Sequence, residues 1–256
     1  MNVQAAIIIS VKNLVKSYDD FTAVKGTGFD VYQGEIFGLL GPNGAGKTTT
    51  LEILETLRDK TSGEVIIDGL NLDNEPNSIK RIIGVQLQAA GYYPSLTLLE
   101  LLDLFGGLYN VKFDKMKMLG SVGLEDKAKA KFKDLSGGQK QRFSLCTTLI
   151  NNPKVIFLDE PTTGLDPQSR RNLWDLIRKI RDNGTTVVIT THYMDEAEEL
   201  CDRVAIMEAG QFIALDTPGN LVDKLVAGGF KRKKEVKQAN LEDVFLDLTG
   251  HEWRDA

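Results

Sequence analysis

A glycine-rich segment that follows an apolar run, Ile36–Leu40, constrains the fold of this chain more than any other feature. The segment reads Gly41, Pro42, Asn43, Gly44, Ala45, Gly46, Lys47, Thr48 and Thr49. Glycines between a strand and a helix let successive backbone N–H groups point at one anion. Lys47 adds a positive charge, and the Thr48 hydroxyl can bind Mg²⁺. A turn that binds nothing would need no Lys-Thr pair, so the segment predicts a cradle for the phosphates of a nucleoside triphosphate.

Composition and charge exclude several classes of protein. With 256 residues and 42% hydrophobic content the chain can bury a core. Its net charge of −5 gives no basic field, so we expect no nucleic acid partner. Two distant cysteines, Cys146 and Cys201, argue against a disulfide framework and favour a reducing compartment. No apolar run approaches the length of a membrane span, so a role at a membrane would require another chain.

Short β-rich runs separated by turn glycines predict an α/β fold. The expected strands are Ile7–Val11, Thr27–Tyr32, Glu35–Leu40, Glu64–Ile67, Ile82–Leu87, Val155–Leu158, Thr186–Ile189, Arg203–Met207 and Gln211–Leu215. Continuous apolar runs such as Val155–Leu158 are typical of parallel strands covered on both faces. The N-terminal part instead alternates and contains hairpin-like pairs. We therefore expect a mostly parallel core sheet with an antiparallel β layer beside it.

A helical pattern replaces the β runs between Gln88 and Pro153. Apolar residues recur there at helical spacing, at Leu98, Leu101, Leu102, Phe105 and Leu108, with further amphipathic stretches at Met116–Val122 and Gln139–Ile150. We expect a helical subdomain at about residues 89–153, inserted in a domain spanning residues 1–220.

A short C-terminal tail, residues 221–256, follows the predicted domain. The basic run Gly228–Lys234 reads as a solvated linker, with a membrane-surface patch as the alternative. A last short helix is expected at Leu241–Leu248.

Two carboxylates, Asp159 and Glu160, follow the predicted strand Val155–Leu158. Open α/β sheets bind their ligands at this end of the strands. Asp159 can hold Mg²⁺ through the water shell of the metal, and Glu160 can face the water that attacks a γ-phosphate. Adjacent acidic residues here are often only a helix cap and its neighbour. The phosphate cradle upstream favours the catalytic interpretation.

A second anion site is predicted at Leu135-Ser136-Gly137-Gly138-Gln139, which opens another helix. Ser136 as a simple helix cap would explain the serine but not the pair of glycines. Two such helix starts in one chain suggest that the nucleotide is sandwiched between two copies, with the Ser136 loop of one copy covering the γ-phosphate held by the other.

Together these motifs resemble the nucleotide-binding subunit of an ATP-binding cassette (ABC) transporter, over residues 7–217. Gly41–Thr49 is similar to the Walker A motif, Val155–Glu160 to Walker B, and Leu135–Gln139 to the signature sequence of that family. The resemblance implies a P-loop NTPase core with ATP and Mg²⁺ as cofactors. It also implies that two cassettes, here two identical copies, dimerise head to tail around two ATP.

Further site residues follow from the same resemblance. Tyr18 would stack on adenine, Gln88 would contact Mg²⁺ and water, and His192 would contact the γ-phosphate. The alternatives are surface packing for Tyr18, an exposed loop position for Gln88 and a structural role for His192. The implied catalytic residues are Lys47, Gln88, Glu160 and His192; the metal site is Thr48, Gln88 and Asp159; and the residues acting across the dimer are Ser136, Gly137, Gly138, Gln139 and Asp166.

The resemblance further implies ATP-driven export through an integral membrane permease, with this subunit at the cytoplasmic face of the membrane. Leu39–Gly44, Glu160–Pro167 and Asn240–Gly250 look like the drug-resistance and multidrug exporter type, whose permease is a separate six-helix chain. The alternative is a soluble ABC-type ATPase that acts on DNA or ribosomes. The interval between the cradle and the signature has room only for a compact helical subdomain, which disfavours a soluble ATPase that acts on DNA or ribosomes.

The segment Ala89–Pro94 is expected to connect the ATP site to the permease. In the resembling family this region forms a groove for a short cytosolic helix of the permease. Tyr92 and Tyr93 would be its aromatic anchors. The alternative is a hydrophobic staple that holds the helical insertion on the core.

Overall fold

The computed structural model describes residues 6–86 and 91–230. Its residues form two compact units, Met1–Leu221 and Val222–Ala256. The first unit holds all the elements discussed below except the end of α8 (Pro218–Ala227). Gln88 and the expected helix Leu241–Leu248 lie outside the described residues, so the predictions made for them stay predictions.

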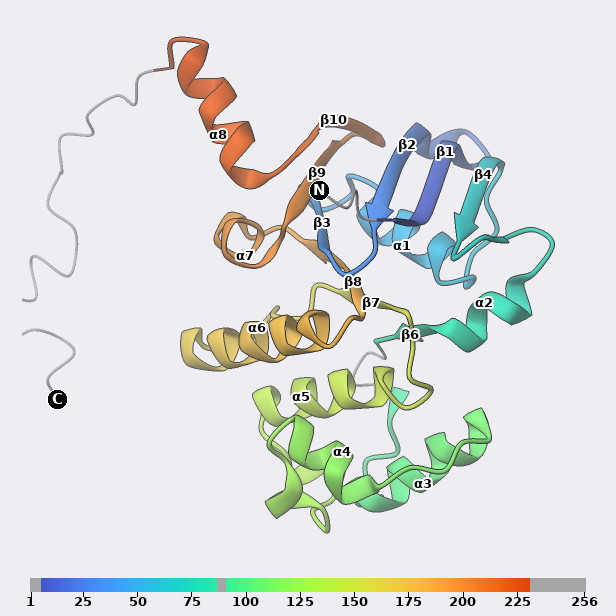
Figure 1. Cartoon of the computed structure of the whole chain (residues 1–256), viewed down its shortest axis with the longest axis vertical. Coiled ribbons are helices and arrows are strands. Elements are labelled where there is room, and N and C mark those ends of the chain that lie inside the picture. The colour runs from blue at the N-terminus through green and yellow to red at the C-terminus, as the bar shows by residue number, and fades with distance from the viewer. Residues whose placement is uncertain (1–5, 87–90, 231–256) are drawn as a thin grey trace, which may run out of the picture. The chain divides into compact units, whose positions relative to one another are not determined.

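Two sheets organise the first unit (Figure 1). The antiparallel sheet has the order β2-β1-β4-β5. Its strands are β1 (Ile7–Tyr18), β2 (Phe21–Tyr32), β4 (Ser62–Ile67) and β5 (Leu70–Asn71). The hairpin β1-β2 is longer than its apolar alternation suggested, because polar residues such as Lys16 and Thr22 continue the ladder at its exposed end.

The second sheet has the order β10-β9-β3-β8-β7-β6. Its strands are β3 (Ile36–Leu40), β6 (Ile83–Val85), β7 (Val155–Asp159), β8 (Thr186–Thr191), β9 (Arg203–Glu208) and β10 (Gln211–Asp216). Only β10 runs antiparallel to its described neighbour. Leu40 is paired with Thr191, and Asp159 with Thr190. This register brings the carboxyl ends of β3, β7 and β8 to one edge of the sheet.

Side-chain alternation along β3 separates two cores. Phe37 and Leu39 belong to the cluster shared with the antiparallel sheet and α1 (Lys47–Leu54). Ile36 and Leu40 belong to the cluster shared with α6 (Pro167–Asp182) and α7 (Met194–Leu200). The central strands are thus apolar on both faces, as expected for parallel strands covered on both sides.

The helical segment has a core of its own. It contains α3 (Leu98–Tyr109), α4 (Lys115–Ser121), the 3₁₀ turns η2 (Glu125–Lys127) and η3 (Phe132–Asp134), and α5 (Gly137–Thr148), while α2 (Pro76–Ile82) precedes β6. Thr97 and Glu100 form a reciprocal capping box that begins α3. In Figure 1, α3, α4 and α5 lie together at the end of the first unit away from the antiparallel sheet. No helix among residues 6–86 and 91–230 is long and apolar enough to cross a bilayer.

Candidate nucleotide site

The glycine-rich loop joins the end of β3 to the first turn of α1. Gly46, just before α1, has a φ of 105°, and a Cβ there would overlap the carbonyl of Ala23 and the side chain of Met207. Only glycine suits this position. No side chain caps the start of α1 among the described residues. The first N–H groups of the helix therefore remain available to an anion, as the sequence predicts.

Lys47 lies inside this loop and is buried. Its Nζ donates to the backbone carbonyls of Gly41 at 2.8 Å and of Pro42 at 3.1 Å. The same atom lies 3.6 Å from Oε1 of Glu160. The ammonium group is thus placed between the phosphate cradle and the carboxylate at the end of β7.

Asp159 joins three segments at the carboxyl edge of the sheet. The Thr48 hydroxyl, at the start of α1, donates to Oδ1 of Asp159 at 3.2 Å. The Thr190 hydroxyl on β8 donates to the same oxygen. Two hydroxyl groups and one carboxylate therefore form a compact set of oxygen atoms beside the phosphate cradle.

Glu160 has an unusual backbone and a crowded carboxylate. Its φ of 46° lies in the left-handed region, which is strained for a residue with a Cβ. Its N–H donates to the Thr190 hydroxyl at 3.0 Å. The Thr163 hydroxyl donates to Oε2 at 3.2 Å, and Nδ1 of His192 lies 3.1 Å from the same oxygen. This His192 contact is close but has no well-aligned hydrogen bond.

The surroundings of Glu160 keep it ionised. Burial by itself would raise the pKa of its carboxyl group, but the contacts with His192 and the charge of Lys47 outweigh this, and the net effect is a lowered pKa. Glu160 is therefore a carboxylate at neutral pH.

The signature-like loop is well formed, and its residues also have local structural roles. Ser136 caps α5: its hydroxyl accepts from the N–H of Gln139 at 3.3 Å, and the Gln139 side chain accepts from the N–H of Ser136 at 2.9 Å. A Cβ at Gly138 would come within 2.9 Å of the Ser169 hydroxyl on α6. Close packing against Ser169 thus requires a glycine at position 138. Gly138 is one of the two glycines that a helix cap alone does not explain. Gly137 has open space around it.

Asp166 is the N-cap of α6. It accepts from the N–H groups of Gln168 and Ser169 and from the Ser169 hydroxyl at 2.6 Å. The hydrogen bonds from Ser169 lower the pKa of its carboxyl group. Action of Asp166 or Ser136 across a dimer stays a prediction.

Tyr18 ends β1, and two cationic groups lie near its ring. The Lys16 ammonium is 4.8 Å and the Arg58 guanidinium 5.3 Å from the ring centroid. The predicted adenine contact is not tested by these distances. The metal role predicted for Gln88 falls outside the described residues.

The interpretation of Tyr92 as an exposed partner anchor is wrong. Tyr92 is 4% exposed, its hydroxyl is 2.8 Å from that of Thr147, and its ring stacks on Phe132 with centroids 4.6 Å apart. Its ring packs inside the core of the helical segment, against Phe105 of α3 and Phe143 of α5, and so has a structural role there. Tyr93 is 62% exposed.

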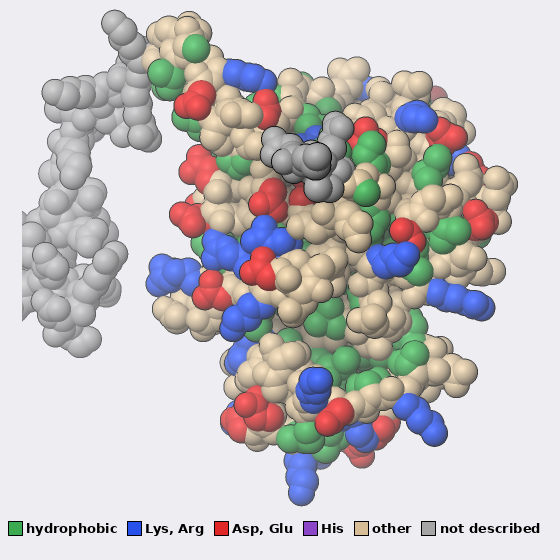
Figure 2. Space-filling model, viewed as in Figure 1, with side chains coloured by type: hydrophobic (Ala, Val, Ile, Leu, Met, Phe, Trp, Pro, Cys, Tyr) green, Lys and Arg blue, Asp and Glu red, His purple; other side chains and the backbone are tan. Residues whose placement is uncertain are grey.

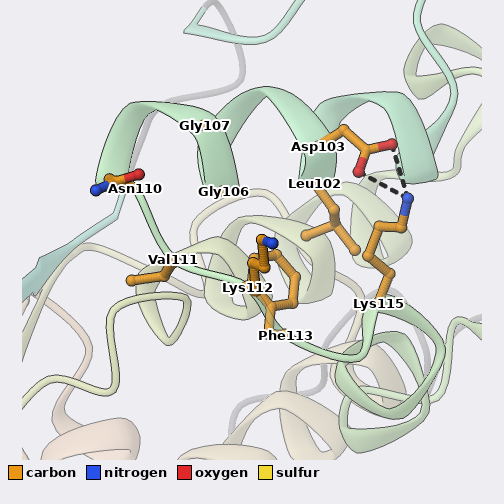
Figure 3. A pocket seen from close by; sticks show the side chains of 9 residues that line it. All are labelled: Leu102, Asp103, Gly106, Gly107, Asn110, Val111, Lys112, Phe113 and Lys115. Atoms are coloured by element: carbon orange, nitrogen blue, oxygen red, sulfur yellow. Dashed lines mark hydrogen bonds and ion pairs between the residues drawn. The ribbon is translucent and has the colours of Figure 1, made fainter.

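Hollows outside the phosphate cradle lie along α3 and, with a volume of about 400 Å³, between α6 and α7. One, of about 640 Å³, is formed by α3 and the chain leading to α4, with the ion pair Asp103–Lys115 at its edge (Figure 3). Another, of about 370 Å³, is an apolar groove between the core and α3. Its lining residues are Glu55, Leu57, Lys80, Ile83, Val85, Phe105, Leu108, Tyr109 and Thr147. Figure 2 shows hydrophobic side chains gathered between α2 and α3 on the face turned to the viewer.

Three residues of this region were missed by sequence reasoning. Thr190 and Thr163 hold Asp159 and Glu160 in place, and Glu55 is a carboxyl group buried at the end of α1. Burial, followed by the charges of Asp159 and Glu52, raises the pKa of Glu55 to about 8. The pairing of β7 with β8 was the available signal for Thr190; Glu55 gave none, since its neighbours in sequence do not reveal its burial.

Comparison with known proteins decides the family. The family model described as ABC transporter matches residues 24–163, more than half of the chain. This chain belongs to the ABC transporter family. The match confirms the family predicted from the Walker A, Walker B and signature-like motifs, and with it the α/β P-loop fold class.

Several relatives of this ABC protein are ATP-binding subunits. The Linearmycin resistance ATP-binding protein LnrL of Bacillus subtilis is 38% identical, covering 85% of this chain and 72% of LnrL. The Nod factor export ATP-binding protein I of Burkholderia orbicola is 35% identical, covering 96% and 98%. The Daunorubicin/doxorubicin resistance ATP-binding protein DrrA of Streptomyces peucetius is 37% identical, covering 94% and 75%.

Solved cassettes share the fold of this ABC protein. The dimeric post-hydrolysis state of the ATP-binding cassette MJ0796, bound to ADP and Pi, has a TM-score of 0.73 at 29% identity, covering 82% of this chain and 98% of that one. A structure of an ATP-binding subunit of an ABC transporter has a TM-score of 0.76 at 26% identity, covering 94% and 99%. This chain is accordingly an ABC transporter ATPase, homologous to subunits of export systems.

Proposed function

We propose that two copies of this chain together bind and hydrolyse two ATP and power export through a separate membrane permease. The observation that carries the proposal is the position of Glu160, whose ionised carboxylate lies 3.6 Å from Lys47 and 3.1 Å from His192 at the edge of the phosphate cradle. The export direction is supported by the relatives named for linearmycin resistance and Nod factor export.

The loop residues bind the triphosphate. The free N–H groups at the start of α1 and the ammonium group of Lys47 face the β- and γ-phosphates, with Tyr18 against the adenine. Lys47 gives up its contacts with the carbonyls of Gly41 and Pro42 for the phosphates, which are stronger acceptors.

The oxygen atoms of Thr48 and Asp159 fit Mg²⁺, which prefers hard oxygen ligands and takes few of them from protein. When bound with ATP, the ion neutralises charge on the phosphates. Thr190 holds the Asp159 carboxylate in the orientation that this requires.

Glu160 orients the attacking water and takes up its proton. Its lowered pKa keeps it ionised, and Thr163 and His192 contact its carboxylate at Oε2. Lys47 stabilises the charge that develops on the transferring phosphoryl group. Ser136, Gly137, Gly138, Gln139 and Asp166 complete the site from a second, identical copy.

The permease docks in the groove between the core and α3. Exposed apolar side chains, Leu57, Leu108 and Tyr109, line its rim, while Tyr93 lies on the loop that precedes α3. A short amphipathic helix fits such a groove, and aromatic anchors commonly contribute much of the binding energy. This contact would hold the subunit at the cytoplasmic face of the membrane.

The test is Glu160→Gln, which keeps the shape of the side chain but cannot take up a proton. We expect ATP hydrolysis to fall about 10²–10⁴-fold, as for loss of a general base, while ATP binding persists and stabilises a dimer in size-exclusion chromatography. A Glu160→Gln protein that hydrolyses ATP at the wild-type rate would remove Glu160 from the mechanism.

A further inference from the structure

The residue after His192 forms a contact that the proposed mechanism does not use. The ring centroids of His192 and Tyr193 are 4.1 Å apart, with an angle of 40° between the rings. His192 is only partly buried, and its Nδ1 contacts Oε2 of Glu160 at 3.1 Å without ideal hydrogen-bond alignment. Glu160 therefore holds the histidine ring at Nδ1 alone, and the contact with Tyr193 adds a second constraint on the orientation of the ring.

Tyr193 is in turn held by α6. The Arg170 guanidinium lies over the Tyr193 ring at 4.6 Å from its centroid, and Nη1 of Arg170 pairs with Asp195 at 3.0 Å. Nε of Arg170 is buried without a hydrogen-bond partner among the described residues. A guanidinium placed in this way gives up one hydrogen bond to lie over an aromatic face, where its planar shape suits stacking.

The next turn of α6 ties down the same segment. Nε1 of Trp174 donates to Oε1 of Glu196 at 2.9 Å, and both side chains are buried. Arg170 and Trp174 are four residues apart and so lie on one face of α6. Asp166, the N-cap of α6, is one of the residues proposed to act across the dimer.

We propose that Tyr193 and Arg170 are positioning residues for His192. The Tyr193 ring sets the orientation of the imidazole toward Glu160, and Arg170 holds that ring on α6. The inference rests on the proposed role of His192 in ATP hydrolysis. A purely structural role, in which the two residues only attach α7 to α6, is the competing explanation.

The test measures the kinetics of ATP hydrolysis in Tyr193→Ala and Tyr193→Phe, each also made with His192→Ala. We expect Tyr193→Ala to lower kcat about tenfold with little change in KM, because a small displacement of a group that acts in the transition state lowers kcat. Tyr193→Phe keeps the ring and should stay within about twofold of the wild type. Once His192 is replaced, Tyr193→Ala should have no further effect, since it acts only through the histidine.

Arg170 and a matched control complete the experiment. Arg170→Met should lower kcat in the same direction, and Arg170→Lys, which keeps the charge but loses the planar group, should restore only part of it. Arg178 ties the same two helices together farther from the histidine, donating to the carbonyl of Glu199 at 2.7 Å. Arg178→Met should leave kcat unchanged.

Each outcome decides between the explanations. An equal loss from Tyr193→Ala with and without His192, or from Arg178→Met as from Arg170→Met, would establish the structural role and overturn the inference. If the single variant Tyr193→Ala keeps the wild-type kcat while the single variant His192→Ala is inactive, the inference is overturned and the proposed function stands. Wild-type kcat in His192→Ala would instead refute the catalytic role of His192, on which the inference depends. If Tyr193→Ala fails to fold, Arg170→Met with and without His192→Ala makes the same distinction.

Discussion

Replacing Glu55 by Gln is expected to stabilise the folded protein, although the side chain is almost completely buried. Glu55 is 6% exposed at the end of α1, facing the apolar groove and close enough to Asp159 and Glu52 to feel their charges. Burial comes first among the causes that raise its pKa from an ordinary value of 4.5 to about 8. At neutral pH the folded protein must therefore bind a proton that the unfolded chain does not hold.

The size of the effect follows from proton linkage. Between pH 4.5 and 8 the native state binds more protons than the unfolded state, so the stability contributed by Glu55 decreases as pH rises through this window. Each pKa unit corresponds to about 1.4 kcal/mol, so at pH 7, about 2.5 units above the ordinary pKa of 4.5, the penalty is on the order of 3 kcal/mol. Gln keeps the shape and carries no charge, which removes the penalty.

Urea unfolding between pH 5 and pH 9 measures this effect. The difference in unfolding free energy between Glu55→Gln and the wild type should be below about 1 kcal/mol at pH 5 and grow toward pH 8. Glu64→Gln, an exposed carboxylate paired with Lys12, serves as a control and should stay within about 0.5 kcal/mol at every pH. A Glu55→Gln protein that is less stable at pH 7, or a difference that does not vary with pH, would refute the reasoning.

Two further predictions separate the partner groove from the core and test the shared site. Tyr92→Ser should destabilise the protein by about 3–5 kcal/mol in urea unfolding. Leu108→Ser should change stability by less than about 1 kcal/mol but reduce co-purification with the permease. If Leu108→Ser co-purifies with the permease as the wild type does, the groove is not the docking site. Mixing Lys47→Ala subunits with Ser136→Arg subunits should restore partial ATPase activity that neither variant has alone, because one site of the mixed dimer is intact; normal hydrolysis by Ser136→Arg alone would exclude a shared site.

Much of the candidate site could be predicted from sequence because its chemistry depends on local order. The phosphate cradle needs glycines, a lysine and a threonine within nine residues, and a helix that starts at Lys47 directs its own N–H groups at the phosphates. The acidic pair Asp159-Glu160 follows its strand directly. Such motifs bring their functional atoms together through backbone geometry alone, so the sequence is enough to recognise them.

Contacts between segments that are distant in sequence could not be predicted in this way. A turn-prone, aromatic stretch predicted exposed anchors, but Tyr92 lies inside the helical core because Phe132 and Thr147, 40 and 55 residues away, surround it. The Gly138 that suggested an anion site also packs against Ser169 of α6. In each case the partner is remote in sequence, and hydrophobic burial rather than local propensity decides the outcome.

The sequence by itself determined the order of the motifs, the α/β class and the ATPase family, since each rests on residue types at short spacing. Only the tertiary structure decided which groups face one another across strands and helices. Strand pairing places the Thr190 hydroxyl on Asp159, folding of α1 against the core removes Glu55 from water, and packing of α6 on α7 brings Arg170 over Tyr193. These contacts depend on register and burial, which arise from the whole chain folding at once and not from any one segment of it.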